Sequence, residues 1–117
     1  MSNQNKTKKI LFTSHVASFQ KFNRPFMRMM REDDWEVHYA SMGEEEILDC
    51  DKSFVVPFTR SPFRLSNITA YRQLKKIINQ ENYDIIHTHT PMGSVVTRLA
   101  AKKARRNGTK IIYTAHG

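Results

Sequence analysis

Short apolar runs alternate along this chain with segments long enough to form helices. The runs include Ile10–Phe12, Phe54–Val56, Ile85–Ile86 and Ile111–Ile112, each short enough for a single strand. Continuous apolar runs of this length are typical of strands that are buried on both faces of a parallel sheet. Strands that alternate with helices predict an α/β fold with right-handed crossovers. The predicted strands are residues 8–14, 35–40, 52–56, 84–88 and 111–114.

A first helix is predicted within residues 18–32, where apolar and basic side chains separate onto opposite faces at the helical period. Pro25 leaves two starting points open. Either the helix begins near Asn23 with Pro25 in its first turn, or it begins earlier and kinks at the proline. The later start would make residues 15–22 a long loop at the carboxyl edge of the sheet. The basic face is either a solvated surface or a surface for an anionic membrane; it consists of Lys21, Arg24, Arg28 and Arg31.

Two further helices follow from their end signals. Asn67 is expected to cap a helix that runs to about Asn79. Thr90 is expected to cap the next helix, and Pro91 suits its first position because proline lacks the amide hydrogen that is unpaired there. That helix is predicted to run to Arg106, where the following Asn-Gly pair ends it.

The bulk properties are those of one globular domain with an anionic partner. We expect residues 1–7 to be a polar tail and residues 8–117 to be a single domain. The net charge of +8 favours phosphate esters, anionic lipid or nucleic acid. Nucleic acid is not expected, because the chain has no helix-turn-helix, zinc-finger or RNP pattern.

Cysteine content and hydropathy point to the cytoplasm. A single cysteine, Cys50, excludes an internal disulfide, and no apolar run approaches the roughly 18 residues of a membrane span. We therefore expect a cytoplasmic protein, with peripheral association at the inner face of the plasma membrane as an open alternative.

Histidines stand at the carboxyl ends of two predicted strands. We expect a Rossmann-like, three-layer open sheet of order 3-2-1-4-5, which makes the first and fourth strands neighbours at the switch point where ligands bind. The amide groups at Met92 and Gly93 open the helix after the fourth strand and are suited to a phosphate. The residues expected to line the crevice are Ser14, His15, His89, Thr90, Gly93 and His116.

The five histidines differ in the role that their positions favour. His87 and His38 lie inside predicted strands and are expected to be buried core residues. His15 and His89 are balanced between a structural and a ligand-binding role, whereas His116 favours function. No metal site is expected, because His87 and His89 share a strand face but lack a third ligand at a known zinc spacing. No Gly-x-Gly-x-x-Gly or Walker A motif is present, so no dinucleotide cofactor is expected.

Six segments together resemble the amino-terminal domain of the GT-B, family-4 glycosyltransferases that build bacterial capsular or exopolysaccharide. The resemblance covers residues 8–117, and its most specific part is the pair Asp-Ile-Ile-His-Thr-His-Thr-Pro and Thr-Ala-His-Gly. The segments are Lys9–His15, Trp35–Val37, Arg60–Phe63, Ala70–Leu74, Asp84–Met92 and Ile112–Gly117.

The resemblance implies two Rossmann-like domains that face each other across a cleft. The amino-terminal domain would bind an acceptor, typically a lipid-diphosphate-linked sugar at the inner membrane face. The carboxyl-terminal domain would bind a nucleotide-sugar, and transfer would retain the anomeric configuration without a metal. His116 matches the family histidine that reaches the donor sugar, and His15 lies in the loop after the first strand. Arg60, within the Arg-Ser-Pro-Phe segment, joins the substrate-binding candidates.

The resemblance also implies an incomplete enzyme. The sequence stops at Gly117, before any donor domain, so we expect it to be inactive alone and the fifth-strand edge to meet a missing domain or a second copy. The alternative is a non-catalytic, flavodoxin-like module that binds a phosphate ligand, an anionic membrane surface or a partner protein.

Overall fold

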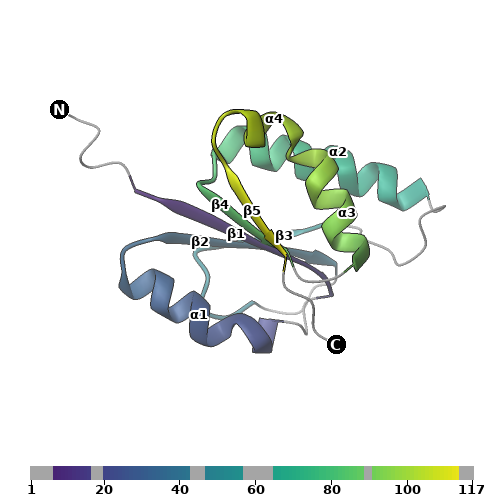
Figure 1. Ribbon diagram of the computed structural model, residues 1–117. Helices are drawn as coiled ribbons and strands as arrows, with labels where there is room; N and C mark the ends of the chain where they lie inside the picture. Colours follow the sequence, from purple (N-terminus) through teal and green to yellow (C-terminus); the bar gives the residue numbers. More distant parts are fainter. Residues whose placement is uncertain (1–6, 17–19, 43–46, 57–64, 89–90, 114–117) are drawn as a thin grey trace.

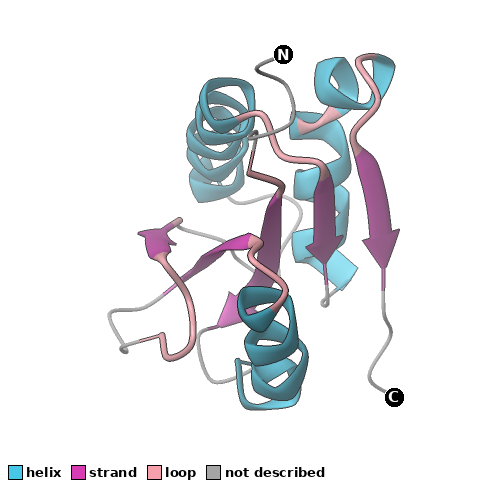
Figure 2. Ribbon diagram, turned by 90° about the vertical axis from the view of Figure 1, so that its left-hand side faces the viewer, coloured by secondary structure: helices cyan, strands magenta, loops and turns pink. Residues whose placement is uncertain are grey.

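The strands form one parallel sheet in the predicted order. The computed structural model describes residues 7–16, 20–42, 47–56, 65–88 and 91–113. Within them, five strands pair in parallel in the order β3-β2-β1-β4-β5 (Figures 1 and 2). The strands are β1 (Lys9–Val16), β2 (Glu36–Met42), β3 (Lys52–Val55), β4 (Ile85–Thr88) and β5 (Lys110–Tyr113). The Rossmann-like α/β prediction is therefore confirmed.

Helices cover both faces of this sheet. Helix α1 (Gln20–Glu32) lies on one face, and α2 (Leu65–Glu81), α3 (Pro91–Ala100) and α4 (Lys102–Arg106) lie on the other (Figure 1). No helix in the described ranges is long and apolar enough to cross a membrane.

Alternating strand residues supply a separate core to each face. On the α2–α4 side, Leu11 and Ile86 pack with Leu74 and Ile78 of α2. On the α1 side, the buried residues are Ile10, Phe12, Val37 and Tyr39 of the sheet together with Met27 and Met30 of the helix. This division into two apolar layers is what holds the carboxyl edge of the sheet in place.

Helix α1 contains Pro25 and does not begin beside it. The helix starts at Gln20, which confirms the earlier of the two predicted starts. Because β1 also extends to Val16, the late start and the long loop over residues 15–22 were wrong. Proline at this position removes the hydrogen bond to the carbonyl four residues earlier. Burial of Met27 and Met30 against the sheet offsets that loss, because both side chains leave water almost completely.

The sequence signals that predicted the starts of the next two helices were wrong for α2 and right for α3. Helix α2 begins at Leu65, so Asn67 is a helical residue and its prediction as a cap was wrong. The four residues between Pro62 and Asn67 include neither proline nor glycine, so nothing local stops an earlier start. Pro91 is the first residue of α3, as predicted, while Thr90 lies outside the described residues.

The predicted third helix is divided at Ala101 into α3 and α4. The Asn-Gly stop is confirmed, because Gly108 has a φ of 107° and its amide donates to the carbonyl of Arg105. A residue with a side chain would be strained in this left-handed conformation, which explains why glycine ends the helix.

Candidate functional site

The carboxyl ends of β1 and β4 form the switch point of the sheet. Thr13 of β1 pairs with Thr88 of β4, and the helices that follow the two strands lie on opposite faces. Successive connections that leave in opposite directions open a crevice above the strand ends. The fold therefore brings together the two strand ends at which ligand binding was predicted.

Buried threonines lie directly beneath this edge on the α3 side. The Thr13 hydroxyl is 3.0 Å from the Thr97 hydroxyl of α3, and both side chains are fully buried. The Thr88 hydroxyl is also buried, and no described residue hydrogen bonds to it. Sequence reasoning missed all three; the available signal for Thr13 and Thr88 was a threonine near the end of an apolar strand segment. The hydrogen bond between Thr13 and Thr97 ties β1 to α3 below the strand ends.

Ser14 has its partner on the opposite face of the sheet. Its hydroxyl is 2.8 Å from the hydroxyl of Tyr39, which also hydrogen bonds to Asn23 of α1. Burial raises the pKa of Tyr39, so its hydroxyl keeps its proton and can donate. Ser14 is itself fully buried. This hydrogen bond gives Ser14 a place in the packing of α1 on the sheet, and its substrate role stays a prediction.

The remaining predicted site residues are placed only in part. His15 belongs to β1 and Gly93 to the first turn of α3, so both backbones stand at the carboxyl edge. His89, Thr90, His116 and Arg60 lie outside the described residues. Their convergence on the crevice stays a prediction that follows from the strand order.

His87 is a core residue, as expected. Its side chain is 7% exposed, and its ring lies 5.4 Å from the Phe12 ring and 5.9 Å from the Phe26 ring. These contacts hold the imidazole on the α1 side of β4, beneath the strand end. His87 thus supports the packing of the site from within the core.

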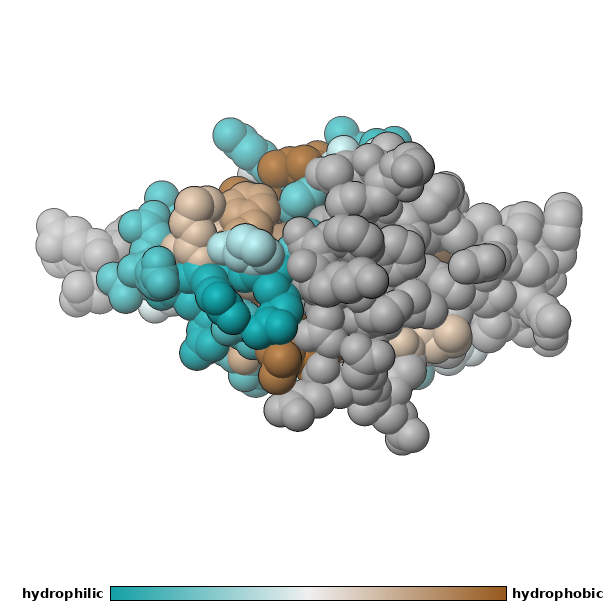
Figure 3. Space-filling model, turned by 90° about the horizontal axis from the view of Figure 1, so that it is seen from below, coloured by the Kyte–Doolittle hydropathy of each residue, from teal (hydrophilic) through white to brown (hydrophobic). Residues whose placement is uncertain are grey.

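The basic face of α1 is largely neutralised inside the fold. Arg24 and Arg28 both pair with Asp49, at 2.9 and 3.2 Å, and Arg31 pairs with Asp51 at 3.4 Å. The hydrogen bond from Arg24 is the main reason that the pKa of Asp49 lies below its usual value. Figure 3 looks onto this α1 side, where hydrophilic side chains gather. The arginines serve to fix the segment between β2 and β3.

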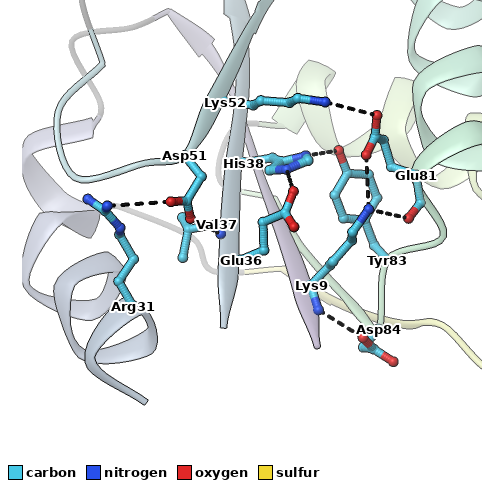
Figure 4. Close-up of polar contacts among 10 residues, drawn as sticks. All are labelled: Lys9, Arg31, Glu36, Val37, His38, Asp51, Lys52, Glu81, Tyr83 and Asp84. Atoms are coloured by element: carbon cyan, nitrogen blue, oxygen red, sulfur yellow. Dashed lines mark hydrogen bonds and ion pairs between the residues drawn. The ribbon is translucent and has the colours of Figure 1, made fainter. Parts of the chain in front are cut away.

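A polar network lies at the opposite, amino-terminal edge of the sheet (Figure 4). The Tyr83 hydroxyl is 2.6 Å from Nδ1 of His38, and Nε2 of His38 hydrogen bonds to the carboxylate of Glu36. A carboxylate only accepts, so Nε2 carries the proton and Nδ1 accepts from Tyr83. Burial raises the pKa of Tyr83, which keeps that hydroxyl protonated. His38 is fully buried with both nitrogens bonded, which confirms its expected structural role.

Glu36, His38 and Glu81 lie close enough to be considered as metal ligands. One ligand atom from each lies within 4.8 Å of the others. However, Lys9 already pairs with Glu81 at 3.0 Å and Lys52 approaches it at 3.7 Å. A divalent cation would have to displace these ammonium groups from a partly buried position, which costs electrostatic energy. The lysines therefore make this cluster a structural ion network.

Glu81→Gln is expected to destabilise the fold by about 1–3 kcal/mol at neutral pH, because Lys9 loses its charged acceptor. The hydrogen bond from Lys9 is the main cause that lowers the pKa of Glu81 below 4.5. The stabilisation is thus present above that value and is lost as pH falls through the lowered pKa. Urea denaturation from pH 7 to pH 3 should show the two proteins converging in acid. Glu32→Gln, at an exposed position, is the matched control, and equal losses in both variants would contradict the role of the network.

A cavity of about 400 Å³ lies at this same amino-terminal edge. Its lining includes Asn79 and Asn82 at the end of α2, and Lys103 and Asn107 at the end of α4. None of the predicted site residues contributes to it. The cavity therefore lies at the opposite edge of the sheet from the switch point.

Comparisons with known proteins agree with this geometry. The Bacillus subtilis (strain 168) protein EpsD, whose name describes it as a glycosyltransferase, is 49% identical over 112 residues. The match includes 95% of this chain but only 29% of EpsD, so the chain spans less than a third of that relative.

Solved structures share the fold at low sequence identity. A glycosyltransferase from Rickettsia africae ESF-5 superimposes with a TM-score of 0.70 at 17% identity, over 92% of this chain and 29% of its own. MurG of Acinetobacter baumannii gives 0.65 at 11% identity, over 92% and 35% of the two chains. Both similarities indicate a common architecture. The family model described as glycosyl transferase 4-like matches residues 9–117, and this chain belongs to that family.

Proposed function

We propose that this chain is the acceptor-side domain of a retaining glycosyltransferase. The reaction would move a sugar from a nucleotide-sugar to a lipid-linked or saccharide acceptor during synthesis of exopolysaccharide or capsule. The observation that carries the proposal is the family match across residues 9–117, which includes both strands of the switch point. The 49% identity to EpsD supports the same chemistry.

The crevice residues divide into two roles in this proposal. His116 reaches the donor sugar when the cleft is complete. The acceptor-side candidates are Ser14, His15, Arg60, His89, Thr90 and Gly93. The start of α3 suits a phosphate, because amide groups at a helix amino-terminus are unpaired and carry partial positive charge. Transfer in this scheme needs no metal or other cofactor, and the nucleotide-sugar is a substrate.

The domain is proposed to be inactive by itself. It spans 29% of the length of EpsD, which leaves most of that relative without a counterpart here. A donor-binding half would complete the cleft. We place the complete protein in the cytoplasm, at the inner face of the plasma membrane, because a lipid-linked acceptor resides there.

The test is to join this chain to the remaining carboxyl-terminal part of EpsD and to measure transfer. The joined protein and the isolated chain would be incubated with labelled nucleotide-sugars and a lipid-diphosphate-linked saccharide. We expect product only from the joined protein, with the anomeric configuration of the donor retained by NMR. A joined protein that binds nucleotide-sugar but forms no glycoside with any acceptor would contradict the proposal.

The edge at β5 is proposed to meet a donor-binding half or a second copy. Among the described strands, β5 pairs only with β4, and Ile112 and Tyr113 are 45% and 37% exposed. Open strand edges with apolar side chains are prone to association.

We expect light scattering to give a mass that rises with the concentration of the isolated chain. Ile112→Lys should lower that association, because a lysine on an edge strand opposes pairing. Val55→Lys, at a 60% exposed position on the other edge strand, is the control. A constant monomer mass at high concentration would rule out self-association through β5.

A further inference from the structure

The fold separates the charges of this chain into a neutralised side and a basic side. Residues 65–110 contain nine lysines and arginines and only two acidic residues, Glu81 and Asp84, for a net charge of +7. The whole chain carries +8. Nearly all the excess charge therefore lies in the segment that contains α2, α3 and α4.

Both acidic residues of this segment are already engaged. Glu81 pairs with Lys9 and Lys52, neither of which belongs to the segment. Asp84 accepts a hydrogen bond from the backbone amide of Lys9 at 2.8 Å. Among the described residues, neither carboxylate forms an ion pair with a cation on the outer surface of the helices.

The cations of these helices are exposed. We call their outer surface the basic helix face, formed by Arg72, Lys75, Lys76, Arg98, Lys102, Lys103, Arg105 and Arg106. Within the described ranges, none of them forms an ion pair, in contrast to Arg24, Arg28 and Arg31 of α1. Lys75 lies over the Tyr71 ring at 5.7 Å, which leaves its charge on the surface.

The three helices present this face as one layer. Helices α2 and α3 pack against each other, and α4 contacts both (Figure 1). Ile68 of α2 and Leu99 of α3 are 52% and 51% exposed on these same helices. On α2, Ile68, Arg72, Lys75 and Lys76 share one side at the helical period. Apolar side chains thus stand among the cations.

We propose that the basic helix face docks on an anionic membrane surface. Cations draw a protein to negatively charged headgroups, and exposed apolar side chains enter the headgroup boundary. Nucleic acid fits less well, because exposed isoleucine and leucine side chains offer it neither hydrogen bonds nor aromatic stacking. The basic helix face would be the surface through which the protein reaches its proposed location at the membrane. Its binding to the membrane does not depend on sugar transfer.

The test is co-sedimentation of the 117-residue chain with vesicles, in the absence of donor and acceptor. Phosphatidylglycerol-containing vesicles are compared with pure phosphatidylcholine vesicles at about 0.01 M and 0.15 M salt, where the Debye lengths are about 30 Å and 8 Å. We expect binding to the anionic vesicles only, and weaker binding at the higher salt. Because sugar transfer is not measured, failure here is distinct from failure of the proposed enzyme activity.

Two variants with the same change in net charge locate the surface. Lys76→Gln with Lys102→Gln removes two cations from the basic helix face and should lower the partition coefficient about 30-fold. Arg28→Gln with Arg31→Gln removes two cations from the opposite side and should change it less than about threefold. Circular dichroism checks that both variants are folded.

Several results would overturn the proposal. They are equal losses in the two variants, equal binding to both vesicle types, no binding to anionic vesicles at low salt, or tighter binding to single-stranded or duplex DNA than to vesicles.

Discussion

Phe12→Ala is expected to lower the free energy of unfolding by about 3–5 kcal/mol. Phe12 is fully buried in β1, and its ring contacts three others at centroid distances of 5.4 Å (His87), 5.9 Å (Phe26) and 6.3 Å (Tyr39). Alanine would leave a cavity between the sheet and α1, because the surrounding strands cannot collapse into it. A domain of this size is stable by only about 5–15 kcal/mol, so the loss would be severe.

Urea denaturation monitored by circular dichroism measures this effect. Phe26→Ala removes the same atoms from a neighbouring ring that is 36% exposed, and it should cost less than half as much. Equal losses at the two positions would mean that burial in the α1-side core does not determine the cost. Because Phe12 lies two residues before Ser14 in sequence and next to His87 in space, the variant also reports how the core supports the switch point.

His116→Ala, placed in the protein joined to the EpsD remainder, is expected to reduce transfer about 10²–10³-fold. The reason is the proposed contact with the donor sugar, where a hydrogen bond that strengthens in the transition state is lost. We expect kcat to fall more than KM changes, since such a contact acts chiefly on the transition state.

Gln80→Ala, at an exposed position near the end of α2, serves as the control and should leave transfer unchanged. Nucleotide-sugar binding by calorimetry separates a loss of catalysis from a loss of folding. An unchanged rate in the His116 variant would remove that residue from the proposed mechanism. The other crevice residues would then become the candidates for contact with the donor.

The strands were predictable because each one is a local apolar run in the sequence, and their order followed from the rules that govern connections between parallel strands. Runs such as Ile10–Phe12 and Ile85–Ile86 are apolar enough to require burial on both faces, and right-handed crossovers leave few topologies. Pro91 and Gly108 were reliable for the same reason, since each acts through its own backbone geometry. The sequence left two starts for α1 open, and the packing of Met27 and Met30, which outweighs the local effect of Pro25, decided for the earlier one.

The position of the candidate site in the fold was predictable from the sequence, whereas the contacts of its residues were predictable only in part. The carboxyl edge follows from strand order, so Ser14 and Gly93 could be assigned to it by position alone. The hydrogen bonds of Ser14 with Tyr39 and of Thr13 with Thr97 join residues that are 25 and 84 positions apart. No local pattern encodes such pairs, because they form only when helices fold back onto the sheet.

The sequence by itself determined the fold class, the strand order and therefore the edge at which ligand binding is predicted, because burial and chain connectivity act through periodic patterns. Tertiary structure alone decided which charges are neutralised. Arg24, Arg28 and Arg31 meet Asp49 and Asp51 across the fold, whereas cations such as Lys76 and Lys102 stay exposed. Composition records an excess of positive charge, but Coulomb interactions depend on distance, and only folding sets which opposite charges come within 4 Å.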